Sequence, residues 1–267
     1  MFKLPNDDYD GPWKAALDVY LQEFLELCFP SIHAAIDWTK PYRFLETELQ
    51  RATVEDQQGR RTADKLVEVW GHDGVAAWVL IHIEIQSQDQ ADFARRMFQY
   101  HYRLRDRFEH PVVSIAVLGD DRATWRPETY ETALWGCELH FRFPTIKLLD
   151  YRERLVDLAA NRNPVAALIL AHLAAQQTRA DPVRRLQEKL AITGRLYDLG
   201  YSPEQVRLAF GFVDWRVELA ERLKSAVRAR TANLRGGTPY DLYYKCRGSR
   251  HRKRTRRGVA RRNCTGA

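Results

Sequence analysis

The sequence predicts an α/β fold followed by a helical subdomain, and three patterns lead to this prediction. Residues 63–88 form two β-rich runs around Asp73-Gly74, a dipeptide typical of hairpin turns. Residues 111–118 are a continuous apolar run, which is typical of a strand buried on both faces. From about residue 150 onward, apolar residues recur at helical spacing without any strand signal. At 267 residues the chain is long enough for one sizeable core and an appendage.

The elements that precede the hairpin are expected to be helical. Apolar residues at helical spacing predict an amphipathic helix over 12–28, which Pro30 ends. Shorter helices are expected at 31–37 and at 42–51. The polar stretch 52–62 is expected to be a loop.

The elements that follow the hairpin complete the α/β part. A stripe that includes Phe93 and Met97 predicts a helix over 90–108. The buried strand at 111–118 comes next, and another strand is expected at 137–143. The later helices are expected at 151–160, 164–178, 182–198 and 203–221. We therefore expect an α/β core at 10–148, a helical subdomain at 149–223 and a separate tail at 224–267.

The second strand of the hairpin alternates strictly between apolar and polar residues. Its apolar residues at positions 79, 81, 83 and 85 point one way, while His82, Glu84 and Gln86 point the other. Asp64 can lie beside them on the antiparallel neighbour. Two carboxylates on one face suit a divalent metal. The alternative is an amphipathic hairpin whose polar face does nothing except contact water.

The order helix, strand with Asp, strand with Glu-x-Gln, helix and buried strand resembles the PD-(D/E)XK nuclease superfamily. Within it, the chain resembles the Rpn family of recombination-promoting, transposase-like nucleases. The resemblance covers roughly residues 10–221 and implies a restriction-endonuclease-like core. The segments that carry it are Arg60–Val69, His82–Gln88, Phe93–Arg103, Pro111–Val117, Leu134–Cys137, Leu196–Ser202 and Phe212–Trp215.

This resemblance implies roles for individual residues. Asp64 matches the first acid of the family and Glu84 the second, while Gln86 stands where lysine is more common. Glu48 falls where some members place an accessory acid. Mg²⁺ prefers oxygen ligands, so Asp64, Glu84, the carbonyl of Ile85 and Glu48 are the expected metal ligands. Asp64, Glu84 and Gln86 are the expected catalytic residues, although Gln86 cannot act as a general acid or base.

The charge distribution limits how the chain can bind DNA. Its net charge is +7, but residues 222–267 hold 15 lysines and arginines against one acid, Asp241. The remaining residues hold 27 basic and 34 acidic side chains, so phosphate neutralisation there must be local. The alternative for the basic residues near the metal face is a solvated helix face. The expected DNA contacts are Arg60, Arg61, Lys65, Arg96 and Arg103.

We expect a soluble, cytoplasmic protein that does not bind membranes. The N-terminal residues lack an apolar segment typical of a signal peptide, and 18 uninterrupted apolar residues occur nowhere. DNA is the expected partner, and a homodimer is left open.

The segment from about Lys224 is rich in Arg and Gly and has no apolar periodicity. One interpretation is a disordered basic arm for nucleic acid. The other interpretation is a shifted reading frame near codon 224. Codons chosen for residues 248–257 can, when read one base along, encode an acidic, helix-forming end. Members of the Rpn family carry an end of that kind.

Removing residues 224–267 is expected to lower the melting temperature by no more than a few degrees. The segment has no apolar pattern to bury, so little stability depends on it. Thermal unfolding of the full and shortened chains measures this, and a larger loss would show that the tail packs on the core. If the tail is a DNA arm, its removal also flattens the salt dependence of DNA binding.

The sequence therefore favours a Mg²⁺-dependent DNA endonuclease that acts in recombination or on mobile DNA. A first alternative is a catalytically decayed relative that binds DNA or protein partners without cleavage, because Gln86 replaces the more common lysine. A second is an interaction protein that uses its helical half, residues 150–221.

Overall fold

The computed structural model describes residues 11–45, 63–84, 92–198, 201 and 203–217. It is a mixed α/β protein, as the sequence predicts. The chain divides into two compact units, Met1–Leu173 and Ala174–Ala267. Our expected boundary at 148 lies inside the first unit.

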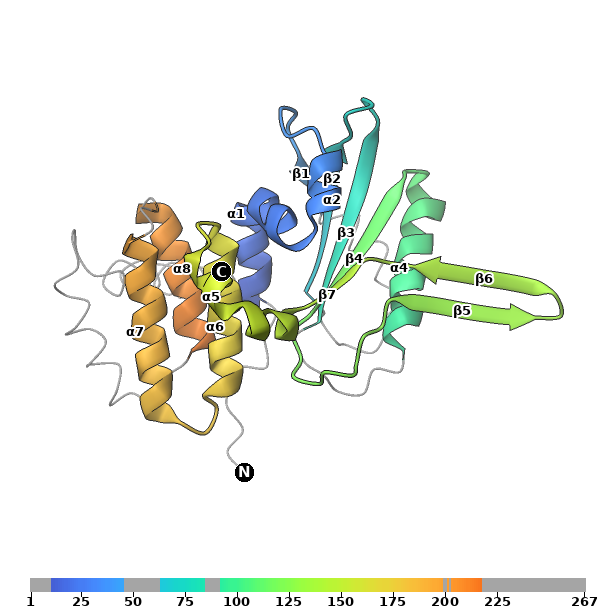
Figure 1. Ribbon diagram of the computed structural model, residues 1–267. Coiled ribbons are helices and arrows are strands. Elements are labelled where there is room, and N and C mark those ends of the chain that lie inside the picture. The colour runs from blue at the N-terminus through green and yellow to red at the C-terminus, as the bar shows by residue number, and fades with distance from the viewer. Residues whose placement is uncertain (1–10, 46–62, 85–91, 199–200, 202, 218–267) are drawn as a thin grey trace, which may run out of the picture. The chain divides into compact units, whose positions relative to one another are not determined.

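The first unit is built on a five-stranded sheet of order β1-β2-β3-β4-β7 (Figure 1). β1, β2 and β3 pair antiparallel, whereas β3, β4 and β7 pair parallel. The predicted hairpin is thus confirmed as β2 and β3, and the buried strand as β4. The strand bounds are β1 Arg43–Phe44, β2 Ala63–Trp70, β3 Ala76–Glu84, β4 Val112–Leu118 and β7 Thr145–Lys147.

The turn between β2 and β3 has the Asp-Gly geometry that the sequence predicts. Gly74 has a φ of 81°, a left-handed conformation that glycine adopts without a steric cost. The backbone amide of Val75 donates to the Asp73 carboxylate over 2.9 Å, and that of Gly71 donates to the carbonyl of Val75 over 2.9 Å.

The helix expected at 42–51 is wrong where the structure describes it. Arg43 and Phe44 form β1, opposite Glu68 and Val67 of β2. The Arg43 guanidinium also donates to the Glu68 carboxylate over 2.8 Å. These pairings join residues far apart in the sequence, so local periodicity carries no sign of them. Residues 46–51 lie outside the described part.

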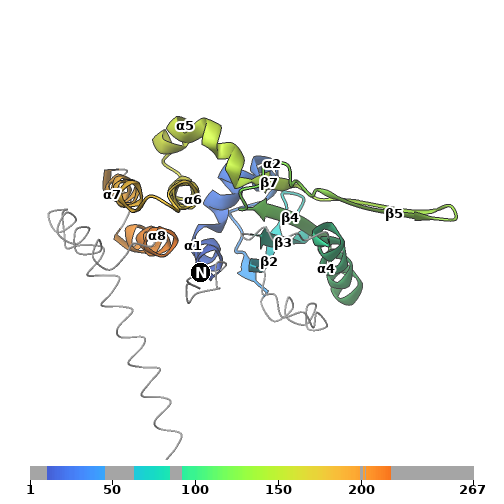
Figure 2. The ribbon, with the colours of Figure 1, turned by 90° about the horizontal axis from the view of Figure 1, so that it is seen from below.

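Helices cover both faces of the sheet (Figure 2). α1 (Gly11–Cys28) lies on one face, and α4 (Phe93–Phe108) lies on the other. Leu66 and Trp78 pack under the second half of α4 and are 1% and 3% exposed. The hairpin therefore does not have the open, solvated face of a simple amphipathic sheet at these positions.

Two further strands, β5 (Thr129–Leu134) and β6 (Cys137–Arg142), form a separate hairpin. β6 confirms the strand expected at 137–143, whereas β5 and the short β7 were not predicted. The connecting turn has positive φ at Trp135 (50°) and Gly136 (85°), as two-residue hairpin turns require. Tryptophan is unusual in this conformation, which explains why the turn gave no sequence signal.

The helices of the first unit dock back onto α1. Asn163, ahead of α6 (Pro164–Gln177), donates to the carbonyl of Glu23 over 2.8 Å and accepts from the amide of Val165 over 2.9 Å. These contacts hold the start of α6 against α1, and the boundary between the two units falls within α6. The other helical elements of this unit are α2 (Pro30–Ala35), a 3₁₀ helix at Leu148–Arg154 and α5 (Leu155–Ala160).

The second unit contains α7 (Pro182–Asp198) and α8 (Pro203–Arg216), as predicted. A buried ion pair joins them, because the Lys189 ammonium lies 2.5 Å from the Asp214 carboxylate. Within the described part of the chain, we find no helix with the length and apolar character needed to cross a membrane.

Candidate functional site

One end of the sheet carries two of the predicted acids together with a further acid and a lysine. β2 runs antiparallel to β3, so its first residues lie beside the last residues of β3, β4 and β7. Asp64 is the second residue of β2, and Glu84 is the last residue of β3. Asp120 follows β4 closely, and Lys147 ends β7. We call this region the carboxyl end of the sheet.

The strand register fixes how the two predicted acids are placed. Asp64 is opposite His82, so Glu84 is its diagonal neighbour, two positions further along β3. Positions 64, 82 and 84 share the α4 face, because residues directly opposite or two apart lie on one face. Diagonal neighbours are about 7–8 Å apart, a spacing that two carboxylates can bridge through one ion. The backbone therefore has the predicted relation between these positions, and their metal-binding role stays a prediction.

Several predicted site residues lie outside the described part of the chain. They are Glu48, Arg60, Arg61, Ile85 and Gln86.

Lys65 occupies a different place from the one expected for a DNA contact. Its side chain is 6% exposed, and its ammonium lies 2.5 Å from the carboxylate of Asp18 on α1. It also lies over the ring of Phe44, 5.0 Å from the ring centroid. Adjacent residues of a strand face opposite ways, so Lys65 is on the face away from position 64. We therefore leave Lys65 out of the proposed DNA contacts.

The two predicted arginines of α4 lie at different distances from the carboxyl end. The start of α4 packs on Leu118 at the end of β4, whereas its second half packs on Val112 at the beginning of β4. Arg96 belongs to the start of the helix and is half-buried. Arg103 belongs to the second half. Of these two arginines, Arg96 is consequently the one at the carboxyl end.

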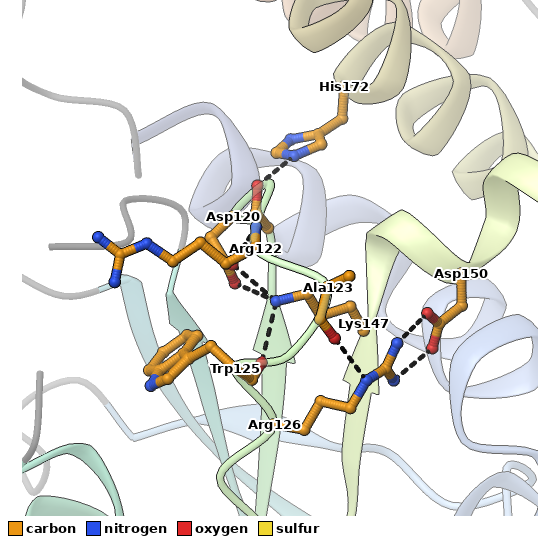
Figure 3. Close-up of polar contacts among 9 residues, drawn as sticks. Asp120, Arg122, Ala123, Trp125, Arg126, Lys147, Asp150 and His172 are labelled. Atoms are coloured by element: carbon orange, nitrogen blue, oxygen red, sulfur yellow. Dashed lines mark hydrogen bonds and ion pairs between the residues drawn. The ribbon is translucent and has the colours of Figure 1, made fainter. Parts of the chain in front are cut away.

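A buried ion pair that sequence reasoning missed stabilises the carboxyl end (Figure 3). The Lys147 ammonium lies 2.7 and 2.6 Å from the two carboxylate oxygens of Asp120 and donates to the carbonyl of Trp125 over 3.0 Å. The two side chains are 1% and 0% exposed. The Asp120 carboxylate also accepts from the backbone amide of Arg122 over 2.8 Å. This pair fixes the chain after β4, the strand that pairs with β3 beside Glu84.

Further contacts hold the same loop in place. The buried His172 ring donates from Nε2 to the carbonyl of Gly119 over 2.7 Å. Arg126 makes two hydrogen bonds to Asp150, of 2.8 and 2.5 Å, and a third to the carbonyl of Ala123 (Figure 3). The Arg126 guanidinium holds the pKa of the Asp150 carboxyl below its usual value.

A cavity of about 310 Å³ opens beside this loop. Three of its lining residues are cationic, but each has an acidic partner in the structure. Lys147 pairs with Asp120, and Arg126 pairs with Asp150. Arg154 lies 3.6 Å from Asp157. The charge of each lining cation is thus compensated by an acid. Its lining residues are Leu118, Arg126, Glu128, Thr145, Ile146, Lys147, Asp150, Tyr151 and Arg154.

The donor set at the carboxyl end fits magnesium by its chemistry. Mg²⁺ takes hard oxygen ligands, commonly one or two carboxylates with water and substrate phosphate. Positions 64 and 84 bring two carboxylates to one face of paired strands. Where the structure describes side chains, no three His, Cys, Asp or Glu residues gather as a metal site, and the side chains of Asp64 and Glu84 are not among those searched.

Comparisons of the chain with protein-family models, with curated proteins and with solved structures find no match. The nuclease assignment therefore depends on the motif residues and on the placement of Asp64 and Glu84.

Proposed function

We propose that this protein is a Mg²⁺-dependent DNA endonuclease of the Rpn type that hydrolyses phosphodiester bonds in recombination or on mobile DNA. The observation that carries the proposal is the diagonal relation of Asp64 and Glu84 on two paired strands. The order of β2, β3, α4 and β4 along the chain supports it, because the resemblance implies the same order.

Each residue has a distinct task in the proposed reaction. Asp64, Glu84 and the carbonyl of Ile85 would hold the metal ion. When bound, Mg²⁺ lowers the pKa of a coordinated water and offsets charge on the scissile phosphate. Gln86 orients the water or the phosphate by hydrogen bonds, and its amide carries no titratable proton.

DNA is held locally in this proposal rather than by bulk charge. The first turn of α4 packs on the end of β4, and the positive dipole end of a helix favours negative phosphate nearby. Arg96 adds a guanidinium at the same end. Arg60 and Arg61 precede Asp64 in sequence and add two further positive charges that can bind phosphate.

A second candidate is a relative that binds DNA without cleaving it. Gln86 favours it, because glutamine replaces the cation that most members of the superfamily place beside the attacking water. Such a protein retains DNA affinity but produces no strand breaks.

Conversion of supercoiled plasmid to its nicked form tests the proposal. The purified full chain is expected to nick plasmid with Mg²⁺ and to stop when EDTA removes the metal. Gel-shift binding to the same DNA, measured in parallel, separates the two candidates. DNA binding without metal-dependent nicking supports the non-cleaving relative. A protein that neither binds nor nicks the DNA contradicts both candidates.

A further inference from the structure

The loop that follows β4 is closed by one buried side chain. The Lys147 ammonium binds the Asp120 carboxylate near the start of the loop over 2.6 Å and the carbonyl of Trp125 further along it over 3.0 Å. Inside the closed segment, the amide of Arg122 donates to the Asp120 carboxylate over 2.8 Å. The amide of Trp125 donates to the carbonyl of Arg122 over 3.3 Å. The segment that carries Trp125 is therefore held at both of its ends.

The ring of Trp125 is held from two directions but is only partly buried. It meets the ring of Phe93, at the start of α4, in an edge-to-face contact with 5.4 Å between centroids and an angle of 76°. The Lys147 ammonium lies 5.5 Å from its centroid. Neither contact is a parallel stack, so neither covers a whole face of the indole. In Figure 3 the ring extends to the opposite side of the loop from the pair of Arg126 and Asp150.

Trp125 lies beside the proposed metal site. It packs on the hydrophobic cluster that contains Phe93 and Leu118, on the α4 face of the sheet. Leu118 is the register partner of Glu84 on the neighbouring strand, and neighbouring strands are about 4.8 Å apart. Positions 64 and 84 share this face. The indole therefore borders the place where the scissile phosphate would lie.

A rigid aromatic ring beside a phosphate site offers a stacking surface to a nucleobase. Stacking on an aromatic side chain adds affinity for any base, because every base has a π face. In a paired duplex the faces of a base are covered by its neighbours. The ring can therefore accept a base only where the strand is unpaired, as in a single-stranded stretch, or where the base has flipped out.

We propose that Trp125 stacks on an unpaired base next to the scissile phosphate, and that the substrate is DNA with a single-stranded segment at the cleavage position. This inference rests on the proposed function, because the stacked base and the cleaved phosphate belong to one strand. The anchored loop lowers the cost of binding, since a ring already held in place loses little freedom when the base arrives. Stacking adds a preference for unpaired DNA that phosphate contacts alone do not supply.

Fluorescence anisotropy of labelled oligonucleotides measures this preference. A single strand, a duplex with a single-stranded overhang and a blunt duplex are compared at one salt concentration, with EDTA so that no strand is cut. The wild type is expected to bind the two DNAs with unpaired bases more tightly than the blunt duplex. Equal affinity for all of them would overturn the inference and leave the nuclease assignment standing. A chain that binds none of them also overturns it, and plasmid nicking then decides whether the nuclease assignment survives.

Trp125→Leu and Trp125→Phe separate stacking from packing. Both keep an apolar side chain against Phe93, but only phenylalanine keeps an aromatic face. Trp125→Leu is expected to raise the Kd for the overhang DNA about tenfold, as loss of one stacked base does, and to leave the Kd for the blunt duplex unchanged. Trp125→Phe is expected to retain most of the affinity. An unchanged Kd in Trp125→Leu, or an equal loss in both variants, would contradict a stacking role.

Trp135→Leu is the matched control. Trp135 is 97% exposed and lies in the turn between β5 and β6, at the end of that hairpin remote from the five-stranded sheet (Figure 1). Its Kd for each DNA is expected to equal that of the wild type. A loss as large as that of Trp125→Leu would show that the effect is not specific to the carboxyl end, and the inference would fail.

A photocrosslink locates the base directly in the wild-type chain. 5-Iodouracil replaces one thymine of the overhang, and ultraviolet light joins it to an aromatic side chain that stacks on it. Mass spectrometry is expected to find the crosslink at Trp125 when the modified base is unpaired, and not when it is paired in the blunt duplex. Crosslinks in which Trp125 takes no part would overturn the inference, whatever the outcome of the nicking assay.

Discussion

Asp64→Ala and Glu84→Ala are each expected to abolish Mg²⁺-dependent nicking while leaving the fold intact. Each change removes one of the two carboxylates at diagonal positions of β2 and β3. The loss in nicking rate is expected to be at least about 100-fold, the usual cost of removing one group that stabilises transition-state charge. Asp64 and Glu84 lie at the ends of their strands, so the rest of the hairpin pairing is retained. Initial rates of plasmid nicking and thermal unfolding measure the two effects.

Glu68→Ala is the matched control for these variants. Glu68 is a carboxylate on the same strand and face as Asp64, but it lies towards the other end of β2. It accepts hydrogen bonds from Arg43 over 2.8 Å and from Trp78 over 3.2 Å. Its removal is expected to cost some stability and to leave the nicking rate unchanged. Equal nicking by wild type, Asp64→Ala and Glu84→Ala would refute the site assignment.

Gln86→Lys distinguishes an active enzyme from a decayed one. Lysine is the more common residue at the corresponding position of the superfamily that the sequence resembles, so the variant is expected to keep or raise the nicking rate. If the wild type does not cleave and Gln86→Lys does, the glutamine alone accounts for the lack of nicking activity in the wild type. If neither cleaves, the loss of activity has another source in the chain.

The sequence predicted those elements whose signals are local. Alternation and the Asp-Gly turn gave β2 and β3, and helical periodicity gave α4, α6 and α7. It failed at Arg43–Phe44, where a partner on β2 decides the conformation. The same alternation that grouped Glu84 with Gln86 also separates Lys65 from Asp64. Applied to β2, it would have assigned Lys65 to the face that packs on α1.

Asp120 and Lys147 show why part of the site could not be predicted from the sequence. The segment Gly119–Asp121 after a buried strand was recognisable as a loop with two acids. The cation that pairs with Asp120, however, is Lys147 of β7. This strand has three residues, too few for a periodic pattern that would predict it. A sequence shows that acids follow a strand, but only the sheet order shows which lysine neutralises them.

Lys147→Met is expected to lower the free energy of unfolding by about 3–5 kcal/mol, because it leaves the buried Asp120 carboxylate without its cation. Asp120→Leu is expected to lower the free energy of unfolding by a similar amount, since it leaves the buried Lys147 ammonium without its carboxylate partner. Urea unfolding followed by tryptophan fluorescence measures both losses. Arg126→Ala is the control, because Arg126 and Asp150 form an ion pair whose side chains are 49% and 51% exposed. That change is expected to cost at most about 1 kcal/mol.

The double variant Asp120→Leu with Lys147→Met decides whether the pair stabilises the fold or only avoids an unpaired charge. Replacing both partners of a buried ion pair by apolar residues of similar size is often neutral or stabilising. We expect the double variant to recover much of the stability lost in either single variant. Recovery is incomplete, because the amide of Arg122 and the carbonyl of Trp125 each lose a hydrogen-bond partner. A double variant that loses as much stability as either single variant would show instead that the ion pair itself holds the loop after β4, and fully additive losses would show that the two side chains act independently.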